Sequence, residues 1–281
     1  MIGGLSEIFW NEQADLPLVL LLQLLPLFGA ALVYAFNERA TAVIAGKLFA
    51  LAELVLCIVA VSHINPTLRS LQLAERFEPL AYHVAVDGIS LIFLLVAALL
   101  TWLMTLYGMS RGMISPGRLF AVLLLAEAGL VGMLVTMNVA WFAAFSALEL
   151  WAVVYLLRRW ASSRAEIHAL ARFVQYQAFG WALFAAGCLV LGWGHAEATG
   201  GRWSFDLFDL VGTIPVGKFQ MVAFYLLFYG LAVRTPLFPL HGWLPNMAQH
   251  GLIAVGPALM VGVKVGIYGM LRFVLPLTPA A

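Results

Sequence analysis

Residues 231–276 of the chain read LAVRTPLFPLHGWLPNMAQHGLIAVGPALMVGVKVGIYGMLRFVLP. Pro236 and Pro239 interrupt the first part of this stretch, and each proline removes a backbone donor and frees a carbonyl group. We therefore predict that a spanning segment over 219–245 is broken near its middle, as occurs where backbone lines a cavity inside a membrane protein. Lys264 lies in the apolar run that follows, and an ionisable group at such a position usually faces a functional interior.

The composition places the whole chain in a membrane. Hydrophobic residues make up 63% of the 281 residues, charged residues make up 10%, and the mean hydropathy is +0.97. A water-soluble core cannot bury that share of apolar side chains. Since a spanning helix needs about 20 apolar residues, the sequence predicts an all-α polytopic membrane protein with about eight transmembrane helices. The predicted spans are 17–36, 42–64, 89–108, 118–136, 139–158, 169–193, 219–245 and 252–275. The alternative for the seventh is a helix that simply ends, followed by a loop over 236–250.

The charges predict the orientation of the chain and exclude one class of partner. The net charge is +1 and basic residues do not cluster, so we expect no nucleic-acid partner. If the spans alternate, one side collects most of the arginines and is predicted to be cytoplasmic. These arginines are Arg39, Arg111, Arg118, Arg158, Arg159 and Arg164. Both termini would then be periplasmic, as in a bacterial inner-membrane protein. The acidic N-terminus lacks the basic region of a signal peptide, so we expect no cleavage.

The spans and loops predict a single membrane domain over 1–281. Residues 17–88 would form N-terminal helices and a periplasmic loop, and 89–275 would form the remaining helices. Residues 80–86 (LAYHVAV) alternate partly, which favours a short strand. Trp203, Phe205, Phe208 and Leu210 are expected on the apolar side of a short interfacial helix.

Three further ionisable residues fall within hydrophobic segments: Glu127, Glu149 and Arg234. A buried lysine such as Lys264 loses the hydration of its charged form, and a nearby carboxylate favours that form, so moving the carboxylate changes proton affinity. The alternative for each residue is a structural ion pair that fixes helix packing. His241 and His250 flank the predicted break and could relay protons. The alternative is that each is an ordinary interfacial histidine. His63, His83, His168 and His195 are expected to be solvated near span ends.

Several segments, in order and in register, resemble the antiporter-like proton-conducting subunits of respiratory complex I (NADH-quinone oxidoreductase), with the M-type subunit nearest. They are YHVAVDGISLIFLLVAALLTWL (82–103), AEAGLVGMLVTMNVAWFAAFSALELW (126–151), FDLFDLVG (205–212), FYGLAVRTPLFPLHGWLPN (228–246) and VGVKVGIYGMLRFVLPL (261–277). The resemblance runs from about residue 80 to the C-terminus.

This resemblance implies a fold of two inverted helix repeats, each with a broken helix and a proton half-channel. By motif, Glu149 in SALELW is the fifth-helix glutamate, Arg234 in AVRTP the basic residue of the broken seventh helix, and Lys264 in GVKVG the eighth-helix lysine. Glu127 in LLAEAG matches a fourth-helix acid seen in part of the family. The sequence stops after the eighth predicted span, so it corresponds to the first repeat, and we expect another chain to supply the second.

Two positions depart from the family pattern. The family usually has lysine where this chain has Arg234, and a guanidinium does not deprotonate in proteins. Arg234 is therefore expected to bias the charge of Glu149 without carrying the proton itself. In WLPNMAQHGLIAVGP (243–257) the family commonly has an Asp after Leu-Pro, which this chain lacks.

The sequence thus predicts a proton-translocating membrane subunit of a complex I-like assembly, with Glu149, Arg234 and Lys264 at the centre of a half-channel. The chain has no redox or metal motif, so quinone, flavin and iron-sulfur clusters are expected only in partner subunits. Other membrane subunits and the lipid bilayer are the expected partners. The alternatives are a subunit of a proton-coupled inorganic-carbon uptake complex, a subunit of a multisubunit cation/proton antiporter, or a nonconducting structural subunit.

Overall fold

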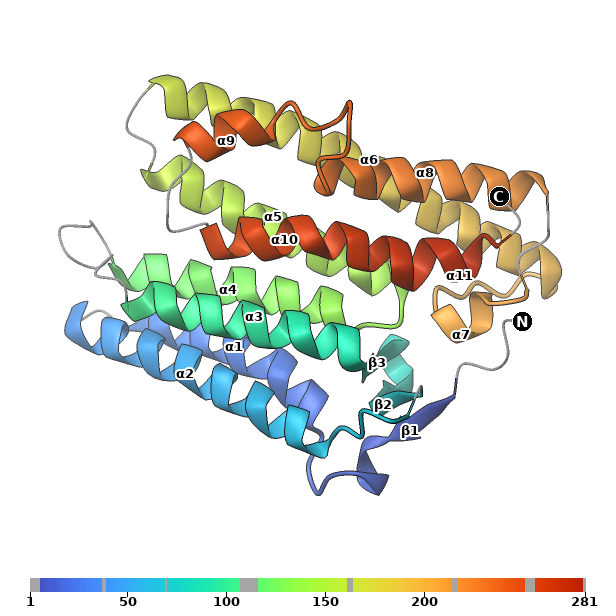
Figure 1. Cartoon of the computed structure of the whole chain (residues 1–281), viewed down its shortest axis with the longest axis horizontal. Coiled ribbons are helices and arrows are strands. Elements are labelled where there is room, and N and C mark those ends of the chain that lie inside the picture. The colour runs from blue at the N-terminus through green and yellow to red at the C-terminus, as the bar shows by residue number, and fades with distance from the viewer. Residues whose placement is uncertain are drawn as a thin grey trace.

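The structure is a computed structural model that describes residues 6–36, 39–68, 70–106, 116–160, 164–213, 217–250 and 256–279. Its helices lie side by side along one direction, and a small sheet covers one end of the bundle (Figure 1). The helices are α1 (Leu18–Ala35), α2 (Arg39–His63), α3 (Gly88–Leu106), α4 (Pro116–Val135), α5 (Val139–Trp160), α6 (Arg164–Ala198), α7 (Leu207–Leu210), α8 (Lys218–Arg234), α9 (Leu244–His250), α10 (Gly256–Gly269) and α11 (Leu275–Leu277). A π-helical turn, Met270–Val274, joins α10 to α11.

The predicted all-α membrane class is confirmed. Within the described ranges, α1 to α6 are each long and apolar enough to cross a membrane, and α8 is a shorter apolar helix. The count of eight spans stays a prediction, because 219–245 is interrupted and 251–255, at the start of the eighth predicted span, lie outside the described residues.

Helix α4 forms the centre of the bundle. In its most apolar 18-residue window 89% of the residues are buried, compared with 28% for α2. Small residues allow neighbouring helices to come close: a Cβ atom on Gly129 would lie 2.7 Å from the Cβ of Glu149 on α5. The helix contacts α1, α2, α3, α5 and α10 (Figure 1).

The predicted break in the seventh span is confirmed. Helix α8 ends at Arg234, the chain turns through 235–243, and α9 begins at Leu244. Pro236 and Pro239 lie in the turns and donate no backbone hydrogen bond, so carbonyl groups at the end of α8 need other partners. The buried Trp243 indole supplies one by donating to the Val233 carbonyl at 3.0 Å.

Three strands form a mixed sheet at one end of the bundle. Strand β1 (Glu7–Phe9) pairs in parallel with β2 (Leu71–Phe77), which pairs antiparallel with β3 (Tyr82–Val86). The strand predicted at 80–86 is confirmed as β3. The other two strands were not predicted, because β1 is very short and β2 is buried over Leu71–Glu75 without alternation.

The predicted interfacial helix was too long, because only two of its four apolar side chains, Phe208 and Leu210, lie on the helix observed. Helix α7 contains only Leu207–Leu210, and its N-cap is Asp206, whose carboxylate accepts from the Phe208 amide at 2.9 Å. Aspartate favours the N-cap position, so the helix begins after it. Trp203 and Phe205 precede the helix and flank Gly192 of α6 instead.

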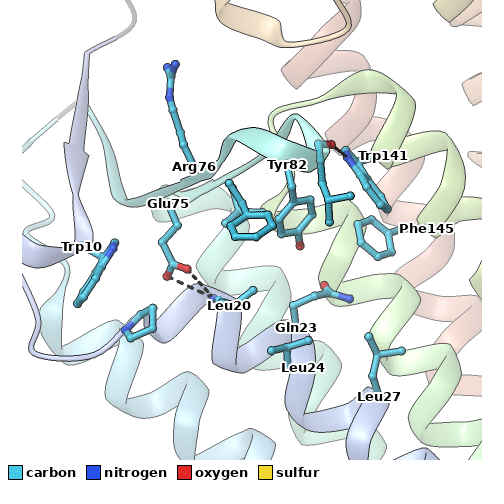
Figure 2. A pocket seen from close by; sticks show the side chains of 14 residues that line it. Trp10, Leu20, Gln23, Leu24, Leu27, Glu75, Arg76, Tyr82, Trp141 and Phe145 are labelled. Atoms are coloured by element: carbon cyan, nitrogen blue, oxygen red, sulfur yellow. Dashed lines mark hydrogen bonds between the residues drawn. The ribbon is translucent and has the colours of Figure 1, made fainter.

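A carboxylate from the sheet caps the start of α1. Glu75 of β2 accepts hydrogen bonds from the amide of Val19, at 3.0 Å, and from that of Leu20, at 3.2 Å, the latter seen in Figure 2. These amides belong to the first turn of the helix and have no partner within it. Burial raises the pKa of Glu75 from 4.5 to about 7, although the two amide hydrogen bonds lower it.

Stability is expected to fall as pH rises from about 5 to 8 because of Glu75. Its pKa is higher in the folded than in the unfolded chain, so between these two pKa values the folded chain holds a proton that the unfolded chain has lost. Raising the pH removes this proton and therefore destabilises the folded chain. The effect should be on the order of 1–3 kcal/mol. Thermal unfolding of the detergent-solubilised protein at several pH values measures it. The neutral Glu75→Gln variant should show a flatter pH profile; an unchanged profile would contradict this assignment.

Candidate functional site

A buried ion pair lies where the broken helix meets α5. Arg234, at the end of α8, donates to the Glu149 carboxylate at 2.8 Å, and both residues are less than a tenth exposed. The guanidinium also donates to the Ser146 hydroxyl at 2.8 Å and to the Gly262 carbonyl at 2.9 Å. Ser146 and Glu149 are three residues apart on α5 and so share one face. The arginine therefore joins three helices, α5, α8 and α10.

A glycine makes this arrangement possible. A Cβ atom on Gly262 would lie 3.1 Å from the nearer Glu149 oxygen and 3.4 Å from an Arg234 nitrogen. Without a side chain at this position, the α10 backbone comes close enough for its carbonyl to accept from the guanidinium. The first glycine of GVKVG, Gly262, thus leaves room for the ion pair.

A small cavity adjoins the pair. Its volume is about 20 Å³, and it is lined by Glu149, Arg234, Gln177 and Trp243, among others. A cavity of about 10–15 Å³ or more can hold a water molecule if polar groups surround it. Glu149, Gln177 and Arg234 supply such groups, so the site can place a water next to the carboxylate.

Lys264 does not share the side of α10 that faces this pair. Residues two apart on a helix point about 200° apart, and Lys264 is exposed whereas Gly262 is buried. Ile267 and Leu271 are exposed on the same face as Lys264. Of the three residues predicted at the centre, the structure brings Glu149 and Arg234 together and places Lys264 on the outer face of α10.

Glu127 has a neighbour that the sequence analysis missed. It is 1% exposed on α4, and it interacts electrostatically with Glu53 of α2, which is fully buried. Among the described residues, no oxygen of either carboxyl group has a hydrogen-bond partner, and the Thr101 hydroxyl interacts with Glu127 too loosely to satisfy it. Two uncompensated charges at such a place would be costly. Glu53, like Glu127, is an acidic residue within an apolar predicted span, and this pattern could have identified it from the sequence.

The histidines predicted as relays are placed as follows. His241 is exposed in the turns between α8 and α9, where its ring lies 5.7 Å from that of Phe238. His250 ends α9, and its side chain lies outside the described part of the structure. A relay function for either residue stays a prediction.

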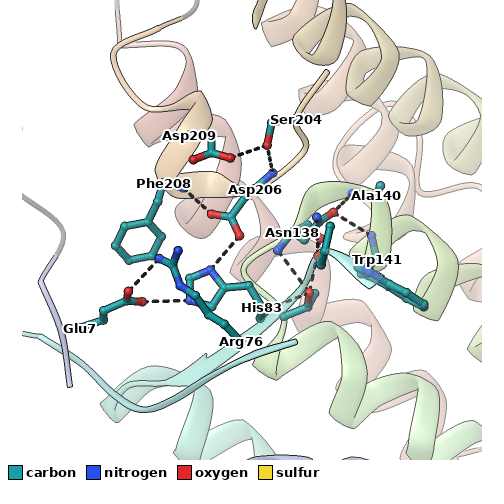
Figure 3. Close-up of polar contacts among 12 residues, drawn as sticks. Glu7, Arg76, His83, Asn138, Ala140, Trp141, Ser204, Asp206, Phe208 and Asp209 are labelled. Atoms are coloured by element: carbon teal, nitrogen blue, oxygen red, sulfur yellow. Dashed lines mark hydrogen bonds and ion pairs between the residues drawn. The ribbon is translucent and has the colours of Figure 1, made fainter. Parts of the chain in front are cut away.

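The prediction that His83 and His195 are solvated was wrong. His83 is 2% exposed, and its two ring nitrogens lie 2.7 Å from Asp206 and 2.9 Å from Glu7 (Figure 3). Arg76 also donates to Glu7, at 2.7 Å. His195 is 7% exposed and contacts the Thr213 hydroxyl. Local hydropathy could not reveal these contacts, because Glu7, His83 and Asp206 come from three distant segments.

The charged groups described above form three separate clusters, the Glu149–Arg234 pair, the Glu53–Glu127 pair and the Glu7–His83–Asp206 cluster. Arg272 and Asp87 form a further ion pair at 2.7 Å. Among the described residues, no group of three His, Cys, Asp or Glu side chains is arranged to hold a metal ion. The first two clusters lie inside the bundle, and the third links the sheet to α7.

Comparisons with known proteins match most of the chain. Residues 118–281 match the family described as "NADH:quinone oxidoreductase/Mrp antiporter, TM". F(420)H(2) dehydrogenase subunit M of Methanosarcina mazei is 27% identical over 94% of this chain and 54% of its own length. NADH-quinone oxidoreductase subunit M of Escherichia coli K12 is 30% identical over 72% of this chain and 40% of its own. The chain thus spans about half the length of the curated relatives it matches.

Solved structures show the same fold. A chain of respiratory complex I from Thermus thermophilus is 27% identical, with a TM-score of 0.76 over 93% of this chain and 53% of that chain. A chain of the Mrp complex from Dietzia sp. DQ12-45-1b has a TM-score of 0.76 at 19% identity, over 93% of this chain and 49% of that chain.

Proposed function

The chain belongs to the NADH:quinone oxidoreductase/Mrp antiporter transmembrane family, and from this premise we propose that it is a proton-translocating subunit of a multi-subunit membrane complex. The observation that carries the proposal is the buried Glu149–Arg234 pair at the break between α8 and α9. An ion pair costs more inside a membrane than in water, so its presence favours a functional interpretation.

Glu149 is the group that gains and loses the proton in this proposal. Arg234 stays charged, because a guanidinium does not deprotonate in proteins. It holds the carboxylate in place and favours its charged form. The cavity of about 20 Å³ beside the pair gives room for a water that would deliver or remove the proton.

Glu53 and Glu127 would form a second proton-holding site nearer α2. Each lies inside the bundle without a cationic partner among the described residues, so a proton shared between them can move when a nearby charge changes. His241 and His250 remain candidates for proton exchange at the broken helix.

Lys264 would act at a contact with another membrane segment. Lipid tails cannot solvate an ammonium group, and Lys264 is exposed on the outer face of α10. We therefore place the next step of the proton path across this face, in a segment that lies beyond the described residues or in a partner subunit. Quinone, flavin and iron-sulfur chemistry, if the complex is redox-driven, would reside in partner subunits.

Replacing Glu149 by glutamine should reduce proton translocation by about 100-fold, the order of effect expected for a proton-transfer group. Proton uptake by inverted membrane vesicles containing the intact complex measures it with a pH-sensitive dye. Lys264→Ala should also impair uptake. The control is Glu78→Gln, an exposed carboxyl group outside the bundle, which should leave uptake unchanged. Normal uptake by a well-assembled Glu149→Gln complex would refute the proposal.

A further inference from the structure

A large pocket opens between α1, the β2–β3 hairpin and the start of α5, away from the ion pair (Figure 2). Its volume is about 470 Å³, which lies within the range of small-molecule sites. Most of its wall is apolar and comes from residues such as Leu20, Leu24, Leu27, Trp141 and Phe145. The pocket lies where the sheet end of the bundle meets the apolar helices, so it presents an apolar wall beside a more polar end.

Two polar atoms in this pocket lack partners. The Tyr82 hydroxyl and the side-chain oxygen of Gln23 are buried, and within the described residues neither has a hydrogen-bond partner. Gln23 is only 3% exposed, and its amide nitrogen donates to the Ala128 carbonyl at 3.1 Å, which leaves its oxygen without a partner among the described residues. Figure 2 shows both side chains directed into the pocket. A buried polar group without a partner costs about 1–3 kcal/mol, so a ligand that supplies hydrogen bonds would be stabilised here.

The surrounding charges restrict the head group of such a ligand. Glu75 lines the pocket, and its carboxyl group, whose pKa is raised to about 7, is ionised part of the time near pH 7 and then repels an anionic head group. Arg76 cannot easily offset this repulsion, because its guanidinium binds Glu7 and lies over the ring of Phe208. In Figure 2 it points away from the pocket. A hydroxyl group suits the site, since it can donate to Gln23 while it accepts from Tyr82.

We propose that this pocket binds an uncharged amphiphile with a hydroxyl-bearing head group and one long apolar chain. The hydroxyl group bonds to Tyr82 and Gln23, and the chain lies along Leu20, Leu24 and Leu27 of α1. Both a monoacylglycerol and a prenylated hydroquinone have this chemistry. The proposal does not depend on proton translocation, because the pocket shares no residue with the Glu149–Arg234 site.

Photo-crosslinking of the full chain in its membrane tests the proposal. The probe is a monoacylglycerol with a diazirine in its acyl chain, and a fatty acid with the same chain is the charge control. Mass spectrometry should place the crosslinks on α1 and the start of α5, with about 2- to 10-fold more labelling by the uncharged probe, the effect of one hydrogen bond. Competition by unlabelled monoolein or by a prenylated hydroquinone then identifies the source. Equal labelling by both probes, or no displacement by either competitor, would overturn the proposal.

Variants separate this pocket from general lipid contact. Leu24→Trp fills the pocket and should abolish labelling, whereas Leu21→Trp, on the same helix but outside the lining, should not. If Leu24→Trp fails to fold, Leu27→Phe replaces it. Tyr82→Phe keeps the ring packed at 5.3 Å from Trp141 and removes only the hydroxyl, so labelling by the uncharged probe should fall about 2- to 10-fold. Undiminished labelling of Tyr82→Phe, or of a folded pocket-filling variant, would refute the site.

Discussion

The Arg234→Met variant should be less stable than the natural chain by about 3–5 kcal/mol, the usual cost of removing one partner from a buried ion pair. Methionine fills part of the space but leaves the Glu149 carboxylate without a cation. It also leaves the Ser146 hydroxyl and the Gly262 carbonyl without their donor. Thermal unfolding of the purified protein in detergent, followed by circular dichroism, would measure the loss.

Two further variants identify the cause. Arg234→Lys keeps the charge but loses the fork of donors, so it should recover part of the stability. The double variant Glu149→Gln, Arg234→Met should be more stable than the sum of the two single effects predicts, because neither change then leaves a buried charge alone. Strict additivity would mean that the pair contributes no coupling, which would contradict the geometry.

His83→Leu should have the second largest effect, a loss of about 2–4 kcal/mol, toward the lower end of the range for buried pairs. The ring lies between Glu7 and Asp206, which are partly exposed at 14% and 16% and so retain some hydration. Both carboxylates would lose their shared partner, and the link between β1, β3 and α7 would open. Limited proteolysis should then cleave the segment before α1 faster than in the natural chain.

The exposed His63 provides the matched control. It ends α2 and contacts the neighbouring backbone at 2.9 Å, without a carboxylate partner among the described residues. His63→Leu should change stability by less than about 0.5 kcal/mol, as is usual for surface positions. Equal effects of the two histidine substitutions would show that the position of the ring between the two carboxylates does not matter.

The sequence predicted the features that depend on local chemistry. Two prolines three residues apart disfavour a continuous helix, so the break after Arg234 was readable from Pro236 and Pro239, whereas the single Pro26 lies within α1 without ending it. The pairing of Glu149 with Arg234 came from the resemblance to a family and could not be derived from spacing, since the two residues lie on different helices. The outer position of Lys264 follows from the rotation of α10, which places Gly262 against Arg234.

The features that the sequence did not predict depend on contacts across the fold. Glu53 and Glu127 lie on α2 and α4, and hydropathy cannot show that two helices direct their acids toward each other. His83 is an ordinary loop histidine in the sequence, and only the folded sheet and α7 bring carboxylates to both of its nitrogens. Strand β2 lacks alternation in burial because it is the middle strand of the sheet and also packs against α1, so that Leu71–Glu75 are all buried.

The enclosure of α4 has a consequence for biogenesis. Its neighbours α1, α2, α3 and α5 lie close to it in the sequence, but α10 follows only after α5, α6 and α8 have been made. During synthesis α4 therefore enters the membrane with one flank still in contact with lipid, and that flank is covered only when α10 arrives. The mean hydropathy of 2.0 over its most apolar window allows α4 to remain in lipid until α10 packs against it. The hydrophobicity of α4 thus stabilises both the intermediate that precedes the arrival of α10 and the folded protein.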